Sequence, residues 1–391
     1  MLERWARNAA MLLLACALAP AVYAAPPAAG TSLSVDQLDQ LLKQMYGQSD
    51  EKVARRIAGI QLTERAGALQ LAQWEAGLAG DRSRKALMAV GDASAFLPLP
   101  AAQTPSSPAP GAETRKQILS RAWDYVEQSL PRFPNFFANR TTTSFAFTTE
   151  ANLQPLDAMG NARELPRGGR VKYEALGPPQ ASDSREPQLF WLGSSTQEVT
   201  YRGGFEVANS PAPASAAAHI APIESVTNGE FGAFLGLVLL DISQDKMVWE
   251  RWEQGPSGLL AVFSYAVPSE RSHFALTLHG QPSEAPAYHG EVAIDPASGV
   301  IGRMTLLATT SGVRFFRESS MLVEYGSIEI GGVAYVCPVH AVAMIRYFDT
   351  FEYANTAHTP VPFASSINDV LFTNYHLFRS QSHFVPGAIA P

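Results

Sequence analysis

Short apolar and alternating segments, separated by turn residues, fill the chain from residue 140 onward, and this pattern limits the fold more than any other feature. Such segments, rich in β-branched and aromatic residues, are typical of strands. No helical pattern alternates with them, so a parallel sheet with crossover helices is not expected. We expect strands at 140–149, 171–175, 198–201, 247–253, 259–267, 274–278, 288–294, 300–307, 321–325, 328–330, 333–345 and 370–378.

The turn residues indicate that neighbouring strands are antiparallel. Gly331 and Gly332 stand between two strand segments and predict a two-residue hairpin loop. The sequence Asp-Pro-Ala-Ser-Gly at 295–299 places proline where a type I turn accepts it and leaves Gly299 free to adopt a left-handed conformation. These features predict a large antiparallel sheet.

A helical segment precedes the sheet. Ser34 and Gln37 form a capping-box pattern, after which apolar residues recur at helical spacing until Gly47. Three further helices are expected, beginning near residues 49, 63 and 81. The first of these three carries Ile60 on its apolar face. The fold class is therefore α+β.

The domain boundaries follow from composition. A helical bundle covers 31–97, an uncharged proline-rich linker covers 98–113, and a β domain covers 114–380, beginning with a helix at 114–130. Residues 230–241 are apolar on nearly every side, which is typical of a helix buried against a sheet. The strand at 259–267 is apolar on both faces, so we expect this internal helix to cover one of them.

The first 24 residues have the pattern of a secretory signal peptide. Arg4 and Arg7 precede an apolar run at 9–19, and small residues lead to a cleavage site after Ala24. The run is too short for a membrane span, and no later apolar stretch reaches the length of a span. We expect a protein secreted into the bacterial periplasm, with lipid anchoring through Cys16 as the alternative.

The charge balance excludes one class of partner. The chain has 29 Lys and Arg against 36 Asp and Glu, a formal net charge of −7, which does not suit a protein that binds nucleic acid. If Cys16 leaves with the signal peptide, Cys337 has no partner, and its apolar strand context indicates a small buried hydrophobe.

Two stretches of the β domain carry a family resemblance. They are Phe-Phe-Ala-Asn-Arg-Thr-Thr-Thr at 136–143 and the strand-turn-strand element at 288–299, followed by Arg-Met-Thr-Leu at 303–306. With the signal peptide and the long meander, they resemble the periplasmic lipoprotein-carrier (LolA/LolB-like) superfamily. The amino-acid sequence at 323–326 and 368–370 is also similar to that of a group of secreted bacterial proteins. The resemblance implies a curved, incompletely closed half-barrel whose concave, apolar face is capped by a helix and holds acyl chains.

The first functional hypothesis is a non-enzymatic protein that binds a hydrophobic small molecule, a lipid or a lipoprotein in this curved sheet. Its expected ligand-binding residues are Phe231, Phe234 and Leu235 of the internal helix and Trp249, Phe263 and Tyr265 of the strands. Trp249 and Trp252 are expected on opposite faces of their strand, and core packing is the competing interpretation of both. The helical bundle positions the ligand or binds a protein partner.

A second hypothesis is a structural or protein-interaction module whose core is filled by its own side chains. No motif of a serine hydrolase, zinc protease, phosphate-binding loop, dinucleotide site or dithiol occurs, so no catalytic residue, metal or cofactor is predicted. The third alternative is a metal-dependent hydrolase that uses His279, His289 and Glu291, provided that 280–287 is a hairpin loop. His340 and His376 are interpreted as core or rim histidines.

Overall fold

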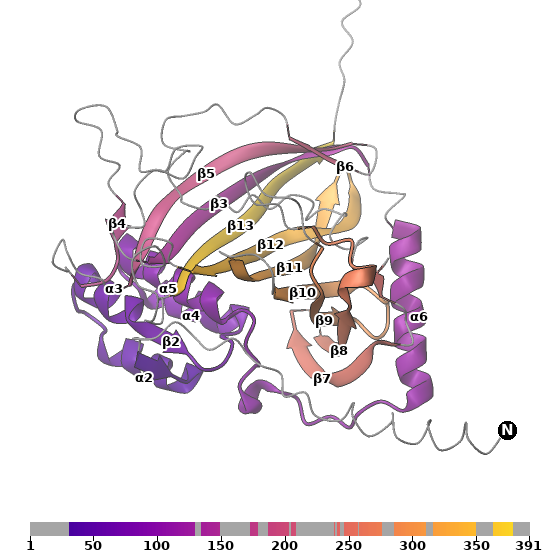
Figure 1. Cartoon of the computed structure of the whole chain (residues 1–391), viewed down its shortest axis with the longest axis horizontal. Helices are drawn as coiled ribbons and strands as arrows, with labels where there is room; N and C mark the ends of the chain where they lie inside the picture. The colour runs from indigo at the N-terminus through magenta and orange to yellow at the C-terminus, as the bar shows by residue number, and fades with distance from the viewer. Residues whose placement is uncertain are drawn as a thin grey trace, which may run out of the picture.

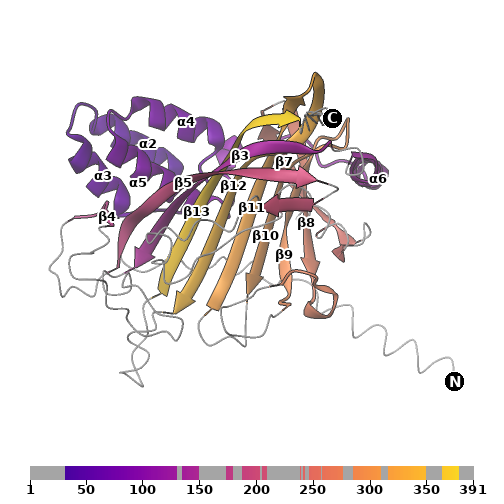
Figure 2. The ribbon, with the colours of Figure 1, turned by 90° about the horizontal axis from the view of Figure 1, so that it is seen from above.

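The computed structural model describes residues 31–129, 134–148, 173–178, 187–202, 205–208, 238, 241–242, 246–256, 258–275, 285–309, 316–348 and 363–377. Within them, a domain of short helices lies beside one large antiparallel sheet, and a single long helix lies on the other side of that sheet (Figures 1 and 2). The predicted α+β class is confirmed. The expected signal peptide and Cys16 lie outside the described residues.

The helical domain contains the predicted helices and one pair of strands that the sequence pattern missed. The capping box at Ser34 and Gln37 is confirmed. Ile60, expected on a helix, lies in a short strand because Gly59 ends the preceding helix, and this strand pairs in parallel with the first residues of the domain. The elements are β1 (Thr31–Leu33), α2 (Val35–Gln44), α3 (Asp50–Ala58), β2 (Ile60–Leu62), α4 (Ala68–Gly77) and α5 (Asp81–Ser94).

Asp50 joins two of these helices. It begins α3, and its carboxylate accepts hydrogen bonds from the backbone N–H groups of Arg82 (3.0 Å) and Ser83 (2.9 Å) in the first turn of α5. Burial raises the pKa of Asp50, but the hydrogen bonds outweigh burial and hold it below the usual 3.8. Asp50 therefore serves as the N-terminal cap of a helix that is distant in sequence.

We expect Asp50→Ala to lower the free energy of unfolding by about 1 to 2 kcal/mol, because two partly buried N–H groups lose their acceptor. Urea unfolding near neutral pH measures this. Asp36→Ala, which removes an exposed acid from the first turn of α2, is the matched control and should cost no more than about 0.5 kcal/mol. Equal losses would contradict the capping role. Because the folded-state pKa of Asp50 is lowered, its contribution is complete above 3.8 and disappears as the pH falls further.

The β part begins with a helix and continues almost entirely as strands. Past a short 3₁₀ turn (Ala101–Gln103) come α6 (Ala112–Ser129) and an open sheet of 11 strands, with the order β4-β5-β3-β13-β12-β11-β10-β9-β8-β7 and β6 paired to β5. The strand pairs are antiparallel, as predicted. The strands are β3 (Phe136–Thr148), β4 (Glu174–Ala175), β5 (Gln188–Arg202), β6 (Phe205–Ala208), β7 (Val248–Gly255), β8 (Gly258–Val267), β9 (Tyr288–Ile294), β10 (Ile301–Thr309), β11 (Phe316–Ile330), β12 (Val333–Phe348) and β13 (Phe363–Leu377).

Both predicted turns form. Gly331 and Gly332 have φ angles of 63° and 85°, the positive values that a tight β11–β12 hairpin requires. Gly299 has a φ of 78°, and a Cβ at this position would lie 2.4 Å from the backbone oxygen of Arg121 in α6. The Arg121 side chain also donates to the backbone oxygen of Pro296 (2.8 Å). The β9–β10 turn is therefore one place where α6 contacts the sheet.

The two faces of the sheet differ in character. On the first face, Val323, Ala341 and Val370 lie side by side on neighbouring strands and belong to an apolar core. α6 adds four buried side chains to this core: Ile118, Leu119, Ala122 and Val126. The second face carries the alternate residues of the same strands, and the helical domain packs on it around Phe145 and Ile367. Figure 2 shows the helical domain and α6 on opposite sides of the strands.

The predicted internal helix is described only in part. The Ile242 N–H donates to the Val238 oxygen (3.1 Å), the spacing of an α-helical turn, and both side chains are buried in the first-face core. This agrees with a helical segment against the sheet. The three expected ligand-binding residues of this segment, Phe231, Phe234 and Leu235, lie outside the described residues.

Candidate functional site

Aromatic side chains gather on the first face near the edge strand β7. Trp249 and Trp252, expected on opposite faces of the strand, pack against each other with ring centroids 4.9 Å apart, so that expectation was wrong. The β7–β8 register shifts between Trp249 and Arg251, and this bulge turns both indoles to the same side. Phe263 lies edge-on to Trp249 at 5.6 Å. The structure thus brings two of the expected ligand-binding residues together.

Tyr265, the third described member of that set, lies deeper. Its hydroxyl donates to the backbone oxygen of Thr305 (2.6 Å), and its ring lies edge-on to Tyr288 at 6.1 Å. The Tyr288 hydroxyl donates to Asp241 (2.6 Å), and burial together with this carboxylate raises the pKa of Tyr288. Tyr265 is 4% exposed and Phe263 only 1%. Their surroundings are those of a packed core with satisfied polar atoms.

The alternative metal site does not assemble as proposed. β9 lies between β8 and β10, so that His289 stands opposite Ala266 and Leu307 and not opposite a hairpin partner as expected. The Glu291 carboxylate accepts two hydrogen bonds from Arg251, at 2.6 and 2.7 Å. His279 lies outside the described residues. The error lay in the assumed register, which a single sequence does not determine.

A cluster of opposite charges, the arginine–glutamate cluster, lies on the second face at the contact with the helical domain. It consists of Arg65, Arg251, Glu253, Glu291 and Arg303. Glu253 pairs with both Arg65 and Arg303, the latter at 2.8 Å. Burial and Arg303 lower the pKa of Arg65 to about 10, so its guanidinium stays charged at neutral pH.

Arg65 belongs to the loop before α4, whereas its partner Glu253 is on β7. The arginine–glutamate cluster therefore connects the helical domain to the sheet by charge. Sequence analysis missed it because its members are scattered along the chain and each one alone resembles an ordinary surface residue.

A second group on the same face, the histidine–carboxylate cluster, contains Asp92, Glu324, His340 and Asp369. His340 contacts Glu324 through Nδ1 (3.0 Å) and Asp369 through Nε2 (2.8 Å). Burial lowers the pKa of His340, but these hydrogen bonds outweigh burial and raise it to about 11. The pKa of Asp92 on α5 is raised, mainly by burial and secondly by the negative charge of Asp369. This is the densest group of potential acid, base and metal-binding atoms among the described residues.

Two further residues that the sequence singled out are His376 and Cys337. His376 is exposed and contacts the backbone oxygen of Asn374 (2.8 Å). Cys337 is fully buried, and burial raises the pKa of its thiol to about 12, which suits the predicted small hydrophobe and not a reactive thiol.

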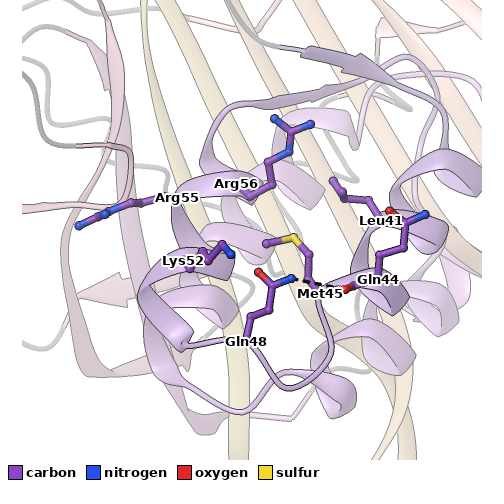
Figure 3. Close-up of a pocket in the computed structure, with 7 residues that line it drawn as sticks. All are labelled: Leu41, Gln44, Met45, Gln48, Lys52, Arg55 and Arg56. Atoms are coloured by element: carbon purple, nitrogen blue, oxygen red, sulfur yellow. Dashed lines mark hydrogen bonds between the residues drawn. The ribbon is translucent and has the colours of Figure 1, made fainter.

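A shallow pocket of about 520 Å³ lies between α2 and α3 (Figure 3). Three cationic side chains, those of Lys52, Arg55 and Arg56, border it on one side, and Leu41 and Met45 contribute apolar atoms. Arg55 also pairs with Glu51 on its own helix.

None of the helices within the described part of the chain is long and apolar enough to cross a membrane. Comparison with known proteins finds no matching family model, no matching curated protein and no matching solved structure.

Proposed function

We propose that this is a secreted, non-enzymatic protein that binds a hydrophobic, lipid-like ligand on the first face of its sheet. The proposal includes export to the periplasm by the signal peptide at 1–24 and the half-barrel architecture that the carrier resemblance implies. One observation carries it. The first-face core continues from β7 to β5 as apolar side chains, while the arginine–glutamate and histidine–carboxylate clusters lie on the second face.

Ligand entry requires that part of the cover moves. Val238 and Ile242 insert into the first-face core from the segment between β6 and β7, not from the sheet itself. An acyl chain is apolar like these side chains and can replace them in the first-face core. Trp249 and Trp252 remain partly exposed on the edge strand β7, and they mark the nearest entry point among the described residues.

Protein purified from its native compartment should carry an amphiphile. Denaturing mass spectrometry of an organic extract is expected to reveal a species bound in a fixed ratio to the chain. After its removal, the protein should enhance the fluorescence of a hydrophobic dye, and added fatty acid should displace the dye. Repeatedly empty protein that also leaves the dye unchanged would contradict the proposal.

A second candidate function is a protein-interaction module with a self-filled core. The low exposure of Phe263 and Tyr265 favours it, because these residues are already covered by protein atoms. Such a protein would act through the helical domain, where the pocket between α2 and α3 presents cations. The same extraction and dye experiment separates the two functions, since the interaction module is expected to give negative results in both.

A further inference from the structure

Asp92 is the unexplained member of the histidine–carboxylate cluster. It is 5% exposed, it projects from α5 towards the second face, and its Oδ2 atom has no hydrogen-bond partner. A buried carboxylate oxygen without a partner is costly, and so its presence calls for an explanation. One ligand atom each of Asp92, His340 and Asp369 lies within 4.8 Å of the other two.

We propose that Asp92, His340 and Asp369 bind a divalent transition-metal cation between α5 and the sheet. The two carboxylates and one imidazole are the donor types that zinc and manganese accept in proteins. Metal–ligand bonds of about 2.0 to 2.2 Å place the donor atoms of a tetrahedral site about 3.4 Å apart. His340 Nε2 and Asp369 Oδ2, now 2.8 Å apart, would separate slightly, and Asp92 would complete the set from within 4.8 Å.

Glu324 holds the histidine in the orientation that a ligand needs. Its carboxylate accepts the Nδ1 proton of His340 (3.0 Å), which directs Nε2 towards Asp369 (2.8 Å). Without metal, Nε2 is also protonated and donates to Asp369, and a bound cation would displace that proton. A carboxylate behind a metal-binding histidine is the usual arrangement that fixes the tautomer and strengthens the ligand. Glu324 is therefore a positioning residue and not a ligand.

A proton is the competing occupant, and it accounts for less of the geometry. A proton on Nε2 satisfies the contact between His340 and Asp369 but gives Asp92 Oδ2 no partner. A cation that contacts all three residues satisfies each of them. Arg65 and Arg303 are close enough to act on Glu324, and Glu253 offsets only part of their positive charge. The carboxylates of Asp92, Glu324 and Asp369 supply the negative charge that a cation at this site requires.

The ligands come from both parts of the molecule. Asp92 belongs to the helical domain, while His340 and Asp369 lie on β12 and β13. Bound metal would therefore link α5 to the sheet and stabilise their contact. His340 and Glu324 are partly exposed, and so water can complete the coordination shell from that side.

The test uses the full chain, stripped with a chelator and titrated with zinc chloride in a calorimeter. We expect one zinc ion per chain and a melting temperature that rises with zinc concentration. Asp92→Asn and His340→Gln should each weaken zinc binding by at least about 10-fold, and Glu324→Gln should weaken it about 10-fold through the histidine. Glu324→Gln keeps every ligand and serves if the other variants fail to fold.

Asp241→Asn is the matched control. Asp241 is also a buried carboxylate beside a histidine, His273, but it lies in the first-face core region and has its polar partners in place. It should bind zinc as the wild type does. No saturable binding, or equal affinity in wild type and Asp92→Asn, would overturn the proposal.

Discussion

Replacing Glu253 by glutamine is expected to lower the free energy of unfolding by about 3 to 5 kcal/mol. The side chains of Glu253, Arg65 and Arg303 are only 8%, 9% and 7% exposed, so removal of the carboxylate leaves two guanidinium groups buried without their shared counter-charge. The loss should also loosen the contact between the helical domain and the sheet. Urea unfolding followed by far-ultraviolet circular dichroism measures the first effect, and limited proteolysis of the helical domain measures the second.

Glu250→Gln is the matched control for this experiment. Glu250 lies on the same strand but is exposed, and it accepts a hydrogen bond from the Ser264 hydroxyl (2.5 Å). Its replacement should change stability by no more than about 1 kcal/mol. If the two variants lose the same free energy, the arginine–glutamate cluster does not hold the two parts together.

Gly290→Ala is the second substitution with a large expected effect, about 3 kcal/mol of lost stability. A Cβ at Gly290 would lie 1.9 Å from the backbone oxygen of Thr305 and 2.8 Å from the Tyr265 hydroxyl. The missing side chain allows Tyr265 on β8 to reach across β9 and donate to this oxygen on β10. The Glu291 N–H donates instead to the Thr305 hydroxyl (2.9 Å). The hydrogen bonds between β9 and β10 at this point therefore depend on the absence of a side chain at Gly290.

Gly302→Ala is the matched control. It tests whether the loss of stability comes from the short distance between Gly290 and Thr305 or would follow from replacing any glycine in a strand. Gly302 lies on the adjacent strand β10, and a Cβ there meets Leu260 at 3.5 Å, an ordinary contact. Gly302→Ala should lower the free energy of unfolding by less than about 1 kcal/mol. Thermal unfolding of both variants measures the difference, and a Gly290→Ala protein as stable as Gly302→Ala would show that β9 and β10 can move apart freely.

The sequence predicted the features that depend on neighbouring residues. The capping box at Ser34, the hairpin at Gly331 and the left-handed conformation at Gly299 are each decided within a few residues, and the structure confirms them. Alternation likewise predicted most of the strands, but it missed β6 and the first part of β5. The strand expected at 274–278 was wrong for residues 274–275, which are not in a strand, and its other residues lie outside the described part of the chain. Ile60 was misplaced because a three-residue strand is too short to show a period.

The features that depend on register or on distant partners were not predictable. A single bulge moved Trp249 and Trp252 to one face, and pairing of β9 with β8 removed the expected partner of His289. The histidine–carboxylate cluster joins Asp92 to residues more than 200 positions away in the sequence. His340 was noticed, but its two carboxylate partners become neighbours only when β11, β12 and β13 are paired.

The proposed function assigns different roles to the two faces of the sheet, and tryptophan fluorescence can separate them. Trp249 and Trp252 belong to the first face, whereas Trp191 lies on the second face under the Lys85 ammonium group, 3.6 Å from the ring centroid. A dibrominated stearic acid quenches only indoles that lie near its bound chain. Replacing a tryptophan that is quenched therefore lowers the fraction of the tryptophan fluorescence that the fatty acid quenches. Replacing a distant tryptophan raises this fraction.

The decisive measurement compares quenching in the wild type, in a Trp249→Phe/Trp252→Phe variant and in a Trp191→Phe variant. We predict saturable quenching of the wild type, a much smaller quenched fraction in the double variant, and an equal or larger fraction in Trp191→Phe. Absence of saturable quenching, or a quenched fraction that falls only in Trp191→Phe, would contradict binding of an acyl chain on the first face.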